Sequence, residues 1–128
     1  MSKSLDQERA AYAWKCVQGK NADYKNLAKS TPALIMSNGL MQTLAFLKSK
    51  DKPNQEHHTI LGAQICAWAM TEKKPAPPEN GVPFRDGFGK IMGILSGMNS
   101  EGYRRATEES LAILRWIRQL ADAAIVGK

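Results

Sequence analysis

Residues 37–50 read SNGLMQTLAFLKSK, and this stretch determines how two neighbouring helices of the chain are joined. Asn38 and Gly39 tolerate left-handed backbone geometry, which commonly ends a helix. Strong helix formers follow at once, with three leucines at one-turn spacing on a single face. Lys48 and Lys50 close the stretch, where positive charge suits the negative pole of a helix. The stretch therefore predicts a tight corner between two helices, the second of which ends in exposed charge.

The rest of the chain also favours helix. Apolar residues recur at helical spacing, and Val, Ile and Thr do not alternate with polar residues over a useful length, so we expect no strand. Glycines, prolines and polar caps separate the apolar stretches. We therefore expect an all-α compact bundle in a single domain spanning residues 1–128. The six expected helices cover about residues 5–17, 24–36, 40–49, 55–73, 88–96 and 101–126.

Prolines and glycines predict interruptions in this pattern. Pro32 lies inside the second expected helix, where it removes an amide donor and disfavours helical geometry at Thr31, so we expect a kink or a break there. Residues 73–87, KKPAPPENGVPFRDG, hold four prolines and two glycines and should form a linker without regular helix. Beyond the linker, three glycines recur every four residues from Gly89, a spacing that favours close approach of a neighbouring backbone.

Composition indicates a globular intracellular protein. The chain has 128 residues, of which 43% are hydrophobic, enough for one sizeable core. No apolar run approaches the roughly 18 residues of a membrane span, and the N-terminus lacks the apolar segment of a secretion signal, so we expect a cytoplasmic protein. Cys16 and Cys66 form no CxxC pair and are expected to be reduced core residues. Trp14, Trp68 and Trp116 stand beside apolar positions and are also expected in the core, with a base-stacking contact for at least one of them as the alternative.

The charge of the chain favours a polyanion as partner. Lys and Arg outnumber Asp and Glu by 18 to 12, and residues 1–52, with nine basic and four acidic side chains, carry +5 of the net +6. Positive side chains can follow a phosphate backbone without reading bases. Candidates for lining such a groove are Lys15, Lys48 and Lys50. Further candidates, which either do the same or form salt bridges within an assembly, are Arg104, Arg105, Arg115 and Arg118.

Signatures of catalysis are weak. His57 and His58 are neighbours that project about 100° apart on a helix, so they cannot share a metal ion, and no third histidine exists. Residues 87–90 lack the glycine spacing and the Ser or Thr of a phosphate-binding loop. Glu108 and Glu109 also face different ways, and we interpret them as a solvated face paired with the preceding arginines. We therefore expect no catalytic residue, no metal site and no cofactor.

Three stretches carry a resemblance that charge alone does not give: YAWKCVQ, YKNLAKSTPALIMSNGLMQTLAFLKSK and YRRATEESLAILRWIRQLADAAI. In the second, a Tyr leads through a Leu and a Pro to Asn-Gly-Leu and then Gln-Thr-Leu-Ala-Phe. Together the stretches resemble the small helical subunit of the type III-B CRISPR-Cas effector, the Cmr complex. The matching positions are Tyr24, Leu27, Pro32, Asn38, Gly39, Leu40, Gln42, Thr43, Leu44, Ala45, Phe46, Tyr103, Ala106, Thr107 and Trp116.

The resemblance implies a non-catalytic protein. Members of this family stack in the minor filament of an RNA-guided complex, several copies beside the backbone subunits that cleave the target. The implied partners are the other Cmr subunits, including the backbone subunit and further copies of the chain itself, together with guide RNA and target RNA. Lys48 and Lys50 would then present charge to RNA. Met41 stands where the family often has a glycine, which concerns how closely a neighbour can approach this helix.

A second interpretation of the same residues stays open. A freestanding basic helical protein that binds nucleic acid, or regulates through it, would share the composition and the charge. Such a protein should bind nucleic acid tightly by itself, whereas a stacking subunit gains affinity through its neighbours.

Overall fold

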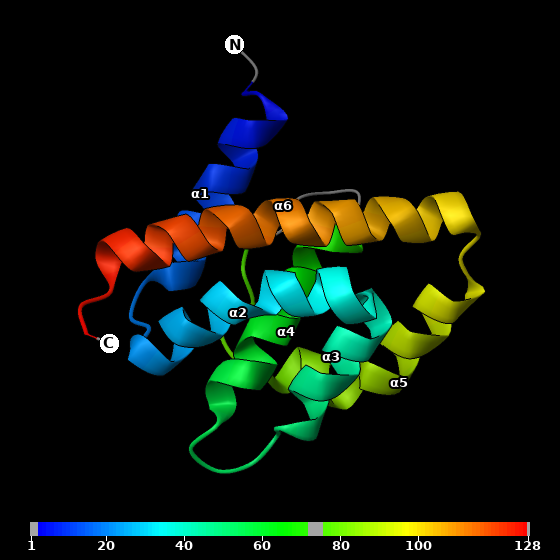
Figure 1. Cartoon of the computed structure of the whole chain (residues 1–128), viewed down its shortest axis with the longest axis horizontal. Helices are drawn as coiled ribbons and strands as arrows, with labels where there is room; N and C mark the ends of the chain where they lie inside the picture. The colour runs from blue at the N-terminus through cyan, green and yellow to red at the C-terminus, as the bar shows by residue number, and fades with distance from the viewer. Residues whose placement is uncertain (1–2, 72–75, 128) are drawn as a thin grey trace.

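The computed structural model describes residues 3–71 and 76–127, and this part of the chain forms six helices and no strand (Figure 1). In chain order the helices are α1 Leu5–Val17, α2 Ala22–Asn38, α3 Leu40–Ser49, α4 Glu56–Ala69, α5 Val82–Gly97 and α6 Ser100–Ala124. The longest is α6, which lies across the bundle and packs against α1, α2 and α4. In turn, α4 packs against α2, α3 and α5 as well. The expected all-α bundle is confirmed.

The core forms because each long helix buries one face. In α6, Ile113, Ile117 and Ala121 recur every four residues and are fully buried. Fully burying one isoleucine side chain contributes about 1.5–3 kcal/mol. The largest fully buried side chains are Trp68, Tyr24, Phe84, Leu40, Leu44, Leu47, Leu61, Ile65, Leu95, Ile113, Leu114 and Ile117.

The corner at Gly39 has the expected geometry. Gly39 has φ +88°, and its N–H donates to the Ile35 carbonyl at 2.8 Å, which closes α2. Its own carbonyl accepts from the Thr43 amide at 3.2 Å, which begins α3. The amide of Met41 donates to the Tyr103 hydroxyl at 3.0 Å, so the start of α3 is fixed to α6. The corner predicted from the sequence is confirmed.

The break expected at Pro32 is absent, since α2 runs as one helix from Ala22 to Asn38 with this proline inside it. The hydroxyls of Ser30 and Thr31 both donate to the Leu27 carbonyl, at 3.1 and 2.7 Å, and hold the turn before the proline. Packing of α2 against α3, α4 and α6 then outweighs the one lost backbone hydrogen bond.

The start of α5 differs from the expected linker. The helix begins at Val82 rather than near residue 88, with Pro83 in its first turn, where the missing amide has no intrahelical partner in any case. The Arg85 amide donates to the Gly81 carbonyl at 2.9 Å. Residues 76–80 are irregular, as expected. Residues 72–75, which include the expected end of the preceding helix, lie outside the described residues.

The expected packing of small and aromatic residues is only partly correct. A Cβ placed on Gly89 or on the two glycines that follow it at four-residue spacing would meet no atom within 4 Å in the described residues, so no neighbour within the chain approaches them. Close packing of α4 against α5 occurs instead at Gly62, where a Cβ would lie 2.6 Å from the Phe84 ring. Trp68 is buried as expected, but Trp14 is 49% exposed, so its assignment to the core was wrong.

Cys16 and Cys66 are both buried free thiols, which confirms the expectation of reduced core residues. Burial raises the pKa of each thiol to about 12. A buried polar network lies beside Cys16, in which the Tyr12 hydroxyl donates to the Gln64 carbonyl at 2.7 Å and the Gln64 side-chain amide donates to the Cys16 carbonyl at 3.2 Å. Within residues 3–71 and 76–127, no helix is long and apolar enough to cross a membrane.

Candidate nucleic-acid interface

Lys48 and Lys50 lie at the C-terminal end of α3, where the helix presents its negative pole. The Nζ of Lys48 lies 6.0 Å from the centre of the Phe88 ring on α5, and that of Lys50 lies 5.5 Å from the centre of the Phe46 ring. Both lysines are partly buried. Neither forms an ion pair with a carboxylate of the described residues, so both charges can bind an external anion.

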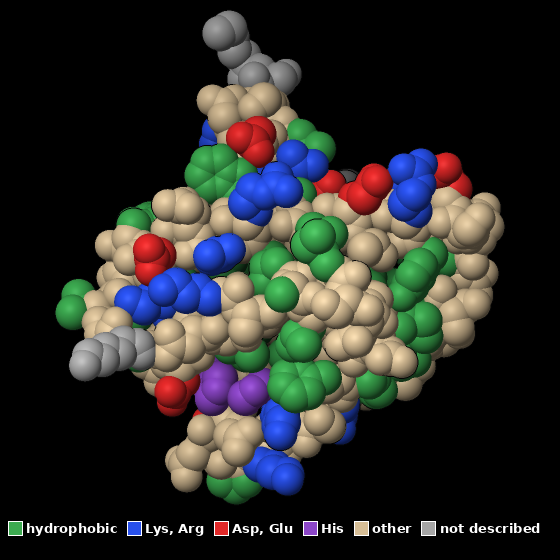
Figure 2. All heavy atoms as spheres, in the orientation of Figure 1, with side chains coloured by type: hydrophobic (Ala, Val, Ile, Leu, Met, Phe, Trp, Pro, Cys, Tyr) green, Lys and Arg blue, Asp and Glu red, His purple; other side chains and the backbone are tan. Residues whose placement is uncertain are grey.

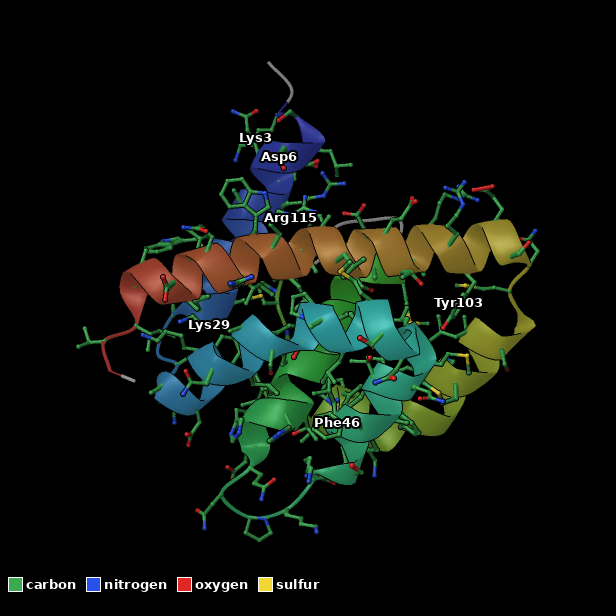
Figure 3. All side chains as sticks on the ribbon, in the orientation of Figure 1. Lys3, Asp6, Lys29, Phe46, Tyr103 and Arg115 are labelled. Carbon is green, nitrogen blue, oxygen red and sulfur yellow. The ribbon has the colours of Figure 1, made fainter. Side chains whose placement is uncertain are left out.

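Aromatic rings lie beside these lysines (Figures 2 and 3). The ring of His58, on α4, meets that of Phe46 edge-on with 6.0 Å between centroids, and the His57 ring lies 4.3 Å from that of His58. Burial lowers the pKa of His58, and the Nδ1 contact with the Gln55 carbonyl at 3.2 Å opposes this shift in part. This shift favours the neutral form of the His58 ring.

Lys15 does not lie with the α3 lysines. It is exposed on α1, in a shallow pocket that it shares with Lys3, Tyr12, Trp68 and Pro77. Figure 1 shows α1 and α3 in separate parts of the bundle, α1 beyond α6 and α3 below α2. Among the described residues, Lys15 therefore does not share a groove with Lys48 and Lys50.

The two arginines near the start of α6 differ in their pairing. Arg104 is exposed but forms ion pairs with Glu101 and with Glu108, the latter at 3.1 Å, so its charge is balanced on its own helix. The pairing of Glu108 with a preceding arginine is as expected from the sequence, and a salt bridge of Arg104 across an assembly stays a prediction. Arg105 is exposed and lines a shallow pocket together with Met98 and the end of α4.

Arg115 and Arg118 are exposed along the C-terminal half of α6. Arg115 lines a shallow pocket between α1 and α6 together with Arg9, Asp6 and Trp116. The indole Nε1 of Trp116 donates to the Asp6 carboxylate at 2.9 Å, which fixes the ring at the edge of this pocket. The two arginines are three residues apart on α6, and Figure 3 shows Arg115 beside α1 and α6, away from the Phe46 side chain of α3.

Glu109 is not the solvated acid that the sequence suggested. Its Oε1 accepts from Arg9 Nε and from Trp68 Nε1, both at 2.7 Å, and its Oε2 accepts from Arg9 Nη2 at 2.9 Å. Only 22% of its side chain is exposed. The carboxylate therefore joins α1, α4 and α6. Its neighbour Glu108 is exposed and paired with Arg104, as expected.

Comparison with known families agrees with this architecture. A family model described as CRISPR-associated protein (Cas_Cmr5) matches residues 5–124, from the first residue of α1 to the last residue of α6. The chain belongs to the Cas_Cmr5 family. Members of this family are small subunits of the Cmr complex of type III-B CRISPR-Cas, so the resemblance found in the sequence is confirmed. Membership implies association with other Cmr subunits.

Sequence reasoning missed two features of this Cas_Cmr5 chain. Phe46 and Lys50 are four residues apart on one helix, a spacing that predicts contact between ring and ammonium, but Phe46 was treated only as part of a motif. No sequence signal places His58 beside Phe46, because α3 and α4 meet only through tertiary packing.

For the described residues, no group of three or more His, Cys, Asp or Glu side chains could hold a metal ion.

Proposed function

We propose that this chain is a non-catalytic structural subunit that stacks in the minor filament of the Cmr complex and contacts the guide–target RNA through its basic surface. The family match over all six helices supports the place in the complex. Lys48 and Lys50 form no ion pair with a carboxylate of the described residues, and this supports the contact with RNA, because such a cation gives up no ion pair with those residues when it binds phosphate. The complex would act in the cytoplasm, on invading transcripts.

The other basic candidates contribute unequally in this proposal. Arg115 and Arg118 offer exposed charge on α6 and form a second contact region. Arg104 is the weakest candidate, because RNA would have to displace two glutamates from it. Lys15 and Arg105 lie elsewhere on the bundle and would meet either RNA or a neighbouring subunit.

Neutralising the α3 lysines tests the RNA contact. We expect Lys48→Gln/Lys50→Gln in an assembled complex to weaken target RNA binding and to lower the slope of log affinity against log salt by roughly 1.4–1.8, since each lost phosphate contact removes about 0.7–0.9. The control is Lys29→Gln, which lies outside the candidate residues and removes a charge that a carboxylate already balances, so it should leave the slope unchanged. An unchanged affinity and slope in the first variant would show that these lysines do not contact RNA.

Native mass spectrometry of the chain with the other Cmr subunits and guide RNA tests the place in the filament. We expect more than one copy of this chain in the assembled complex. A complex that assembles without it would contradict the stacking role. Tight RNA binding by the isolated chain in that case would favour the freestanding alternative.

A further inference from the structure

A row of aromatic rings borders the basic end of α3, and positive charge alone does not explain it. We call Phe46, His57 and His58 the ring patch. In Figure 2 the two histidines lie directly beside the hydrophobic side chain that Figure 3 labels as Phe46, with blue basic side chains immediately below. The ring patch lies at the surface and is built from two helices, α3 and α4.

Phe46 is on the side of α3 that faces away from the core. Its neighbours Leu44 and Leu47 are buried to within 1% and hold the helix in the bundle, whereas Phe46 is 38% exposed. An aromatic ring left in water forfeits part of the free energy that its burial would contribute. The folded chain therefore presents apolar ring surface that its own core does not use.

The ring patch is held in place rather than free to collapse. His58 meets Phe46 edge-on, with an interplanar angle of 72°, and His57 lies against His58 at 40°. The contact of His58 with the Gln55 carbonyl restricts its ring, and the packing of α3 against α4 fixes the spacing between the two helices. Holding the rings before a partner arrives lowers the entropy lost on binding.

Charge around the ring patch is uneven. At the Phe46 end, Lys50 holds its ammonium 5.5 Å from the ring centre, whereas Lys48 projects further round the helix, with its Nζ 6.0 Å from the centre of the Phe88 ring on α5. At the His57 end, a shallow pocket includes Asp23 and Glu56 as well as Lys20. The combination of π surface with unpaired positive charge therefore belongs to the Phe46 end.

We propose that Phe46, with His58 at its edge, stacks an unpaired RNA base while Lys48 and Lys50 hold the adjoining phosphates. This inference rests on the RNA-contacting role proposed above and specifies its ligand as a single-stranded nucleotide. Bases inside a duplex are already stacked on one another and cannot lie on the ring. Every base has a π face, so the site accepts any base, and loss of stacking weakens binding roughly 5- to 140-fold per base.

Photo-cross-linking locates the base. The assembled complex, with guide RNA, is given target RNAs that carry 5-iodouridine at one position each, and cross-linked peptides are identified by mass spectrometry. We expect a cross-link to Phe46 or His58 from a position that is not paired with the guide. If the complex still binds the target RNA but every cross-link is to residues other than Phe46 and His58, the proposal is wrong.

Substitution of Phe46 separates stacking from charge. Phe46→Leu keeps an apolar side chain but removes the π face, whereas Phe46→Trp keeps a π face at this position. The affinity of each complex is compared for two targets, one with a base and one with an abasic nucleotide at the cross-linked position. Wild type and Phe46→Trp should bind the target with the base roughly 5- to 140-fold more tightly. Phe46→Leu should lose this preference, and its salt slope should stay unchanged. Lys48→Gln/Lys50→Gln should lower the slope and keep the preference.

The outcomes distinguish this inference from the function on which it rests. If the lysine variant lowers the salt slope while Phe46→Leu retains the preference for the base, stacking is wrong and the RNA contact stands. If neither variant changes RNA binding, both are wrong. If Phe46→Leu folds with native helix content but is excluded from the complex, the ring patch packs against another subunit, and the stacking proposal fails.

Discussion

At the scale of single residues, Glu108 and Glu109 show how one position along a helix changes the role of a carboxylate. Glu109 accepts from Arg9 and Trp68 in a partly buried site, and Glu108 pairs with Arg104 in solvent. We expect Glu109→Ala to lower the free energy of unfolding by about 2–4 kcal/mol, because it leaves a guanidinium and an indole N–H without this partner. Glu108→Ala should lower the free energy of unfolding by only about 0–1 kcal/mol, because its ion pair is exposed to solvent. Denaturant unfolding of both variants is the measurement, and equal losses would contradict this assignment.

The two thiols give a second prediction at this scale. Burial raises the pKa of Cys16 and of Cys66 to about 12, so at about pH 8 roughly one thiol in ten thousand is ionised in the folded chain, against a quarter for an exposed cysteine. We expect both thiols to react with a disulfide reagent only as fast as the protein unfolds, and to react fully in concentrated guanidinium chloride. A native thiol that reacts within the mixing time would be inconsistent with the buried positions of both residues.

At the scale of elements, glycines at two positions should respond oppositely to the same substitution. Gly39 has φ +88° and ψ 164°, a region that other residues rarely enter, so Gly39→Ala should destabilise the corner by about 1–3 kcal/mol. Gly89 lies within α5 with open space around its missing Cβ, so Gly89→Ala should stabilise the protein by about 0.5–1 kcal/mol. Thermal unfolding of both variants checks the signs, and a stabilising Gly39→Ala would show that the corner is not strained.

The number of helices and their type follow from local signals, whereas several boundaries do not. Residues 40–49 carry a glycine stop before the helix and an apolar face within it, and α3 was predicted from this pattern with its observed ends. Pro32 and Pro83 misled the prediction for one reason. The cost of a proline depends on its position in the helix and on packing around it, and the sequence alone shows neither.

At the scale of the whole molecule, the sequence identified the basic residues of the candidate interface but not their grouping. Lys48 and Lys50 share a helix end, so their proximity was predictable from spacing. The packing of α1 places Lys15 away from these two lysines, and the packing of α4 places His58 beside Phe46. Neither position can be predicted from spacing along the sequence. Periodicity predicts which face of each helix is apolar, but it does not predict which other helix that face packs against.

Lys25 shows that a lysine in the basic N-terminal part can serve the fold alone. It is 8% exposed, and its Nζ donates to the carbonyls of Ile125 and Gly127 at 3.1 and 2.7 Å, so α2 holds the chain just beyond α6. We expect Lys25→Met to lower the free energy of unfolding by about 1–3 kcal/mol and to reduce hydrogen-exchange protection of the Ile125 amide.

Lys29→Met is the matched control for Lys25→Met. Lys29 lies one turn further along α2, exposed and paired with Asp122 at 3.4 Å. Lys29→Met should therefore lower the free energy of unfolding by only about 0–1 kcal/mol. Neither lysine offers RNA an unpaired ammonium, so both variants should keep the salt slope of RNA binding in the assembled complex. A reduced slope in Lys25→Met with intact Ile125 protection would mean that this ammonium leaves its carbonyls for phosphate. The charge of the N-terminal part would then act at the interface even where the fold buries it.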